Sequence, residues 1–117
     1  MNEIVLITGM AGSGKSTVGR LVAEHFSKSM HIDVDQLRKM IVKGMEVPNK
    51  QGFSEEVHQQ FQWARSTVIY MAQLYASQGV DVVIDDACVP PNFAEQYAPL
   101  FENRGYIAFC CFPQHPR

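Results

Sequence analysis

Apolar residues along this chain form short unbroken runs that alternate with stretches of helical spacing. The first run, Ile4 to Ile7, is typical of a parallel strand that is buried on both faces. A helix is predicted from Lys15 to Phe26, because apolar residues recur there every three or four positions. The residues on that apolar face are Val18, Leu21, Val22 and Phe26.

A second strand is predicted over residues 30–34, where apolar and polar side chains alternate. Alternation indicates a strand that is less fully covered on one side, so we expect it at an edge of the sheet. His31 and Asp33 are then expected to face solvent. Asp35 is expected to cap a short helix. The apolar residues of that helix are Leu37, Met40 and Ile41.

A loop and a long helix are predicted next. Pro48, Asn49 and two glycines indicate a loop over residues 44–52. The helix runs from about Ser54 to Gln78, and Gly79 ends it. Its expected core face comprises Val57, Phe61, Ala64, Val68, Met71 or Ala72, and Tyr75, and we also expect Trp63 to line the core or a pocket.

The last elements are a strand, a helix and a strand. The third strand covers Val80 to Ile84 and ends at Asp85 and Asp86, and residues 89–92 indicate a turn. A fourth helix is predicted over residues 93–101 and a fourth strand over residues 106–112. Strands that alternate with helices predict an α/β fold, with a parallel sheet covered by helices on both faces. Residues 1–117 are expected to form a single domain.

Composition and charge narrow the classes of function. Apolar residues make up 46% of the 117 residues and charged residues 19%, which is typical of a globular protein. The formal net charge is −2 and the ten Lys and Arg are scattered, so a nucleic-acid partner is not expected. No apolar run approaches the roughly 20 residues of a membrane span. Cys88, Cys110 and Cys111 lack metal-ligand spacing, and no secretory signal is present, so we expect a cytoplasmic protein.

The segment between the first strand and the first helix carries the strongest chemical signal. Residues 9–16 read Gly-Met-Ala-Gly-Ser-Gly-Lys-Ser and fit the pattern G-x-x-x-x-G-K-[ST] at every fixed position. Glycines allow the backbone to turn its N–H groups toward phosphate oxygens, and the helix that follows adds the positive end of its dipole. This pattern predicts a P-loop that binds a nucleoside triphosphate. The predicted binding residues are Gly9, Met10, Ala11, Gly12, Ser13, Gly14, Lys15, Ser16 and Thr17.

Within this predicted P-loop, three side chains have distinct expected roles. Lys15 is predicted to reach the β and γ phosphates, and the Ser16 hydroxyl to ligate Mg²⁺. Thr17 is predicted to contact the α phosphate.

Carboxylates fall where parallel α/β sheets bind ligands, beyond the carboxyl ends of the strands. Asp85 and Asp86 are candidates to support Mg²⁺ together with Ser16, and the sequence does not separate them. Asp35 is a candidate to orient an acceptor hydroxyl and take its proton. Arg38, one helical turn on, is a candidate to hold an anionic substrate group or the transferring phosphoryl. The alternative is that Asp35 only caps its helix and pairs with Arg38.

The chain resembles a known group of proteins. The resemblance rests on the P-loop, on residues 31–38 (His-Ile-Asp-Val-Asp-Gln-Leu-Arg), on residues 82–86 (Val-Val-Ile-Asp-Asp) and on the pair Pro90-Pro91. This group comprises the P-loop kinases related to chloramphenicol phosphotransferase, the zeta-toxin kinases and the kinase domain of polynucleotide 5′-kinase, often described as AAA family ATPases. The resemblance spans essentially the whole chain. It implies a P-loop NTPase three-layer sandwich with family strand order 2-3-1-4-5, of which this chain would supply 2-3-1-4.

The resemblance also implies an activity. It implies ATP and Mg²⁺ as cofactors, Lys15 and Ser16 as their ligands, Asp35 as the acceptor-activating residue with Arg38 as its partner, and Asp85 or Asp86 as the carboxylate of the third strand. Members of the group continue into an arginine-bearing lid and a fifth strand, so we expect this chain to be C-terminally truncated. The open edge of the fourth strand is then expected to favour a homo-oligomer.

The sequence therefore predicts an ATP-dependent phosphotransferase that moves the γ-phosphate to a hydroxyl of a small molecule. Three alternatives stay open. The first is a non-catalytic nucleotide-binding module or truncated remnant, because the lid is missing. The second is a polynucleotide 5′-kinase, which the acidic balance disfavours. The third is a nucleotide-binding switch or motor, which the lack of an Asn-Lys-x-Asp motif and of an Asp-Glu pair after the third strand disfavours.

Overall fold

The computed structural model describes residues 2–9, 14–87 and 93–102, and the backbone of residues 107–111. Its four strands pair in parallel in one sheet with the order β2-β3-β1-β4, the order that the resemblance implies. The strands are β1 (Ile4–Gly9), β2 (Ser29–Asp33), β3 (Asp81–Ala87) and β4 (Ile107–Cys111). The predicted α/β class with a parallel sheet is confirmed, and the alternating strand β2 lies at an edge.

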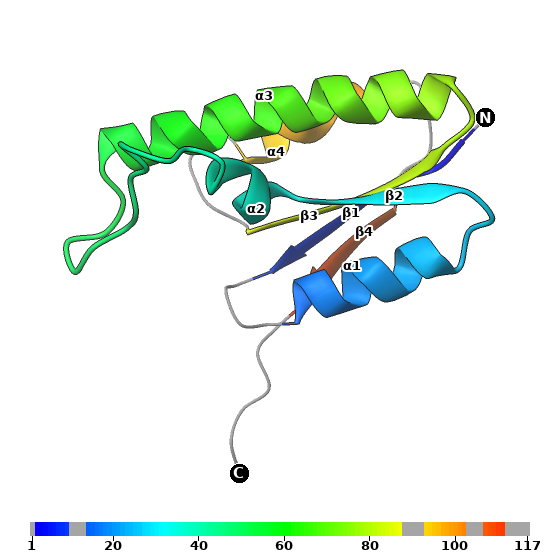
Figure 1. Ribbon diagram of the computed structural model, residues 1–117, viewed down its shortest axis with the longest axis horizontal. Helices are drawn as coiled ribbons and strands as arrows, with labels where there is room; N and C mark the ends of the chain where they lie inside the picture. The colour runs from blue at the N-terminus through cyan, green and yellow to red at the C-terminus, as the bar shows by residue number, and fades with distance from the viewer. Residues whose placement is uncertain (1, 10–13, 88–92, 103–106, 112–117) are drawn as a thin grey trace, which may run out of the picture.

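Helices cover both faces of the sheet (Figure 1). One face carries α1 (Lys15–Glu24), and the other carries the long helix α3 (Glu55–Ser77) and the short α4 (Phe93–Tyr97) with the 3₁₀ turn η1 (Ala98–Leu100). The short helix α2 (Val34–Arg38) follows β2 directly. No helix among the described residues is long and apolar enough to cross a membrane.

Strand β1 lies in the middle of the molecule, and all six of its residues are buried. Its side chains alternate between the two layers. Ile4 and Leu6 join the apolar cluster under α3, whereas Val5 and Ile7 join the cluster under α1. Both faces of the strand are covered, and this explains why the run carries no polar interruption.

The residues that α1 and α3 bury against the sheet differ in part from those predicted from the sequence. Helix α1 buries Gly19 and Ala23, while Leu21, predicted on its apolar face, is 61% exposed. Small side chains allow α1 to approach the sheet closely, so the larger residues lie at the sides of the contact. On α3, Trp63 is 56% and Tyr75 42% exposed. The prediction that Tyr75 lies on the core face was therefore wrong, and Trp63 is not a core residue. The buried face of α3 comprises Val57, Gln60, Phe61, Ala64, Arg65, Val68, Ala72 and Ala76.

The junction between β2 and α2 also corrects the sequence prediction. Asp33, rather than Asp35, caps α2: its Oδ1 accepts hydrogen bonds from the backbone N–H groups of Asp35 at 3.0 Å and Gln36 at 3.3 Å. The strand therefore ends one residue earlier than expected, and the fully buried Val34 begins the helix. Because α2 ends at Arg38, Met40 lies beyond it and is 71% exposed.

Strand β3 is longer than predicted and includes Asp85 and Asp86. It is the strand between β2 and β1. Its pairing with β1 continues to Ala87 and its pairing with β2 to Asp85, which lies opposite both Ile7 and Asp33. Because side chains alternate along a strand, Asp85 faces the α1 layer and Asp86 the α3 layer. The predicted turn at residues 89–92 and Cys88 lie outside the described residues.

We expect the α3 layer to carry much of the stability of the fold. Val68 is fully buried against the sheet, so Val68→Ala removes two buried methyl groups and leaves a cavity. The free energy of unfolding should fall by about 2 kcal/mol. Urea denaturation measures this loss. Val42 is 92% exposed and gives the matched control, since Val42→Ala should change stability by less than about 0.5 kcal/mol. Equal losses in the two variants would contradict the described packing.

Candidate functional site

The N-terminus of α1 lies at the carboxyl edge of the sheet, just after β1. Gly14 precedes the helix with φ +87°, a left-handed conformation that favours glycine. No side chain caps the N–H groups of the first turn, so the described structure leaves them available to an anion. Gly9, Gly14, Lys15, Ser16 and Thr17 of the predicted phosphate-binding set are described. Met10, Ala11, Gly12 and Ser13 lie outside the described residues.

Ser16 brings α1 into contact with two carboxylates from neighbouring strands. Its hydroxyl oxygen lies 3.2 Å from Oδ2 of Asp33 at the end of β2 and 3.4 Å from Oδ1 of Asp85 near the end of β3. Asp33 and Asp85 are register partners in the sheet. Three oxygen-bearing side chains from three elements therefore converge at one point of the carboxyl edge.

His31 lies on the same side of β2 as Asp33, because the two residues are two positions apart along the strand. Its Nε2 contacts Oδ2 of Asp85, and 21% of its side chain is exposed. The sequence prediction that His31 and Asp33 face solvent was therefore wrong. Both side chains are half-buried and face α1, which covers this edge of the sheet.

Asp86 points into the opposite layer and makes different contacts. Its Oδ2 accepts hydrogen bonds from Nε of Arg65 at 2.7 Å and from the Tyr97 hydroxyl at 2.8 Å. All three side chains are buried. Burial raises the pKa of Asp86, and the Arg65 cation opposes this rise. Burial also raises the pKa of the Tyr97 hydroxyl, and the neighbouring Asp86 carboxylate raises it further. Of the two candidate carboxylates, only Asp85 contacts Ser16 in the described structure.

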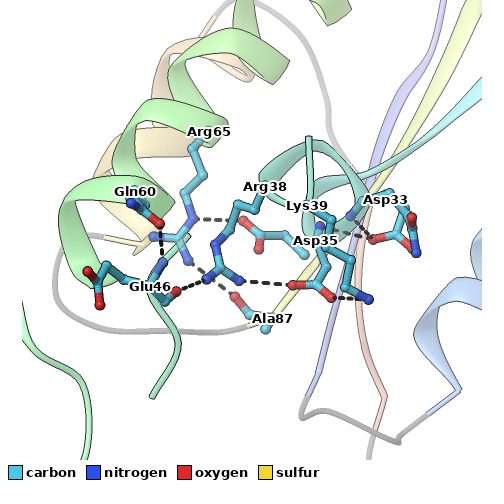
Figure 2. A network of polar contacts seen from close by, with 10 residues as sticks. Asp33, Asp35, Arg38, Lys39, Glu46, Gln60, Arg65 and Ala87 are labelled. Carbon is cyan, nitrogen blue, oxygen red and sulfur yellow. Dashed lines mark hydrogen bonds and ion pairs between the residues drawn. The ribbon is translucent and has the colours of Figure 1, made fainter. Parts of the chain in front are cut away.

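Asp35 lies at the start of α2, and 46% of its side chain is exposed. Arg38 donates from Nη1 to Oδ1 of Asp35 at 2.9 Å, and Nζ of Lys39 lies 3.3 Å from Oδ2 (Figure 2). The predicted pairing of Asp35 with Arg38 is present. The carboxylate keeps a solvent-accessible surface between two cations.

Arg38 also holds the loop that follows α2. It is only 4% exposed, its guanidinium stacks on Phe61 at 3.9 Å from the ring centroid, and its Nη2 donates to the Glu46 carbonyl at 2.8 Å. Gln60 of α3 accepts from the Glu46 N–H at 2.8 Å (Figure 2). It also donates to the Gly44 carbonyl at 2.8 Å. Arg38 and Gln60 together fix the chain at residues 44–46 beside Asp35.

The donor set around Ser16 fits Mg²⁺. Among the described residues there is no group of three His, Cys, Asp or Glu side chains that could hold a metal ion by themselves. Mg²⁺ does not require such a group, since it prefers oxygen ligands and keeps several waters and phosphate oxygens. One hydroxyl and two carboxylates therefore suit a magnesium ion that arrives with a nucleotide.

Three residues of this region were missed from the sequence. Asp33 and His31 were assigned to solvent, and Arg65 was not assigned a role. An Asp directly before a helix is a typical N-cap, and this signal could have identified Asp33. No sequence signal pairs Arg65 with Asp86, because that contact depends on how α3 crosses β3.

Comparison with known proteins places the chain in a family. The model of the family described as zeta toxin matches residues 2–110. The chain belongs to the zeta toxin family. This family is one of the P-loop kinase groups that the sequence resembles.

Individual relatives of this zeta toxin family member include proteins named as kinases. The adenylyl-sulfate kinase of Myxococcus xanthus is 30% identical over 83 residues, which cover 68% of this chain and 40% of that protein. A sugar kinase structure from Janibacter sp. HTCC2649 matches with TM-score 0.61 and 17% identity, over 95% of this chain and 60% of that one. The APS kinase of Mycobacterium tuberculosis matches with TM-score 0.62 and 24% identity, over 99% of this chain and 80% of that one.

At these identities, the two structural matches establish the fold of this zeta toxin family member. The chain spans less than half of the curated adenylyl-sulfate kinase and about 60% of the sugar kinase.

The buried contact between Arg65 and Asp86 gives a pH-dependent prediction. Arg65→Met removes the cation and leaves a buried carboxylate, which should cost about 3–5 kcal/mol of unfolding free energy at neutral pH. Without Arg65, the pKa of Asp86 should rise further, because burial is the larger cause of its shift. The loss should therefore shrink as the pH falls and Asp86 is protonated, and grow as the pH rises through the raised pKa.

Chemical denaturation between pH 4 and pH 8 measures this dependence. Arg20 is 78% exposed and pairs with Glu24 on α1, so Arg20→Met is a matched control that should change stability by less than about 0.5 kcal/mol at any pH. If the loss of unfolding free energy in Arg65→Met were the same at every pH, it would not come from the unpaired Asp86 carboxylate.

Proposed function

We propose that this protein is an ATP-dependent phosphotransferase that moves the γ-phosphate to a hydroxyl group of a small molecule. The observation that carries the proposal is the convergence of Ser16, Asp33 and Asp85 at the N-terminus of α1. Membership of the zeta toxin family and the similarity to proteins named as kinases support it.

In this proposal, the triphosphate binds at residues 9–17. The N–H groups at the start of α1 donate to phosphate oxygens, and the helix dipole favours the negative charge. Lys15 neutralises the β and γ phosphates. Burial raises the pKa of Asp86, and the positive charges of Arg65 and Lys15 oppose this rise.

Ser16 and Asp85 would hold Mg²⁺, with Asp33 beside them. When bound, the ion neutralises charge that develops on the phosphoryl oxygens. Asp86 is not assigned to the metal, because Arg65 and Tyr97 occupy its carboxylate in the other layer.

Asp35 is proposed to orient the acceptor hydroxyl and to take its proton as the phosphoryl group is transferred. We propose Arg38 as the residue that holds Asp35, since its guanidinium is buried and bonded within the protein. The acceptor would approach across residues 44–46. The formal net charge of −2 favours a small acceptor over a polynucleotide.

Calorimetry with Mg-ATP tests the nucleotide site. Lys15→Met should weaken binding by about 10- to 100-fold, because a hydrogen bond to a charged group contributes about 1.5–3 kcal/mol. Lys28 is exposed and lies at the other end of the sheet, before β2, so Lys28→Met is the matched control and should leave the affinity unchanged. Absence of binding by the unmodified protein to Mg-ATP and Mg-GTP would contradict the proposal.

A phosphoryl-transfer screen over small alcohols and sugars tests the catalytic assignment. With the best acceptor, Asp35→Asn should lower the transfer rate by about 10²–10⁴-fold, because the amide cannot accept the proton. The affinity for ATP should stay within a few-fold. Glu24→Gln neutralises a carboxylate that is 60% exposed on α1 and serves as control. Full activity of Asp35→Asn would show that another group takes the proton.

A further inference from the structure

His31 lies at this site, and the proposed function gives it no role. It lies on the edge strand β2, two residues before Asp33. Its Nε2 contacts Oδ2 of Asp85, a side chain with no exposed surface. The other oxygen of the same carboxylate, Oδ1, is the one that lies 3.4 Å from Ser16. The two oxygens of Asp85 therefore have separate partners.

A buried carboxylate needs a partner for each oxygen, since an unpaired charged oxygen in the interior is strongly unfavourable. An imidazole N–H that donates to Oδ2 meets this need for one oxygen. It also fixes the rotation of the carboxylate about its Cβ–Cγ bond, and with it the direction in which Oδ1 points. Without this donor, the carboxylate can turn away from Ser16 toward other donors or water.

Gly19 of α1 makes room for this contact. A Cβ atom at position 19 would lie 2.7 Å from Nε2 of His31 and 3.4 Å from Oδ2 of Asp85. Glycine inside a helix costs about 1 kcal/mol relative to alanine, so the position is best explained by the close approach that it permits. Ser16 and Gly19 are three residues apart and lie on the same face of α1. The approach of Gly19 to His31 therefore also sets the distance between Ser16 and Asp85.

We propose that His31 is a positioning residue for the metal side of the nucleotide site. It donates from Nε2 to Oδ2 of Asp85 beneath Gly19, and this contact keeps Oδ1 of Asp85 directed at Ser16. The proposal rests on the proposed function, because it assigns Ser16 and Asp85 to Mg²⁺. It predicts a specific defect: loss of His31 weakens the contribution of Mg²⁺ to nucleotide binding and leaves the contribution of the phosphate loop intact.

Calorimetric titration of ATP with excess Mg²⁺ and with excess EDTA separates these two contributions. His31→Leu keeps an apolar side chain of similar size without a donor. Its ATP affinity in EDTA should stay within about 2-fold of the unmodified protein. The gain in affinity that Mg²⁺ confers should fall by about 10-fold or more, the typical effect of losing a residue that orients a metal ligand. His31→Gln, which retains an N–H donor, should recover part of the gain.

His25 gives the matched control, since it is an exposed histidine at the C-terminal end of α1, away from Asp85. His25→Leu should behave as the unmodified protein in both titrations. If Mg²⁺ raised the ATP affinity of His31→Leu as much as that of the unmodified protein, the proposal would be overturned. It would also be overturned if His31→Leu lost as much ATP affinity in EDTA as in Mg²⁺, because an equal loss indicates general damage to the site. If His31→Leu does not fold, the same comparison is made with His31→Ala, which also lacks the donor. Absence of ATP binding by the unmodified protein would instead contradict the proposed function, and this inference with it.

A double-mutant cycle tests the part played by Gly19. Gly19→Ala should lower the gain from Mg²⁺, because the new methyl group displaces the imidazole from Asp85. In a His31→Ala background the methyl group has room, so Gly19→Ala should add little further loss. Additive losses in the double variant would show that Gly19 acts independently of His31 and would overturn this step.

Discussion

The alternation of side chains along β3 is the constraint on which the site depends. Asp85 and Asp86 are adjacent in sequence, yet one faces the α1 layer and the other the α3 layer. Asp85 meets Ser16 and His31, while Asp86 meets Arg65 and Tyr97. A shift of register by one residue would turn Asp86 toward α1 and Asp85 toward Arg65 and Tyr97. The central position of β3, paired on both sides, opposes such a shift.

Close packing of α1 on the sheet then brings the site together. The helix contacts the sheet through Gly19 and Ala23, whose small side chains let the backbone approach β2 and β3. The same helix carries Lys15 and Ser16 in its first turn. In the proposed function, phosphate binding and metal binding would thus depend on the same helix, whose first turn places Ser16 beside Asp33 and Asp85.

The acceptor side is organised by a different set of contacts. Arg38 is buried between Asp35, the Glu46 carbonyl and the ring of Phe61, and Gln60 fixes the same loop from α3 (Figure 2). The guanidinium of Arg38 therefore orders both Asp35, the proposed base, and residues 44–46 of the loop. The proposed acceptor side therefore depends on α2 and α3, while the proposed nucleotide side depends on α1.

The sequence by itself determined the order of strands and helices, the buried run of β1 and the start of α1, because periodicity and glycine spacing are local properties of the chain. It also identified Asp35, Arg38 and the pair of aspartates as polar groups at the carboxyl edge of the sheet. Only the tertiary structure decided that Asp33 caps α2, that Asp85 rather than Asp86 meets Ser16, and that His31 lies inside the site. These outcomes depend on which helix covers each face of a strand. The contact between residues as far apart in sequence as 31 and 85 follows from this packing, which no local sequence pattern encodes.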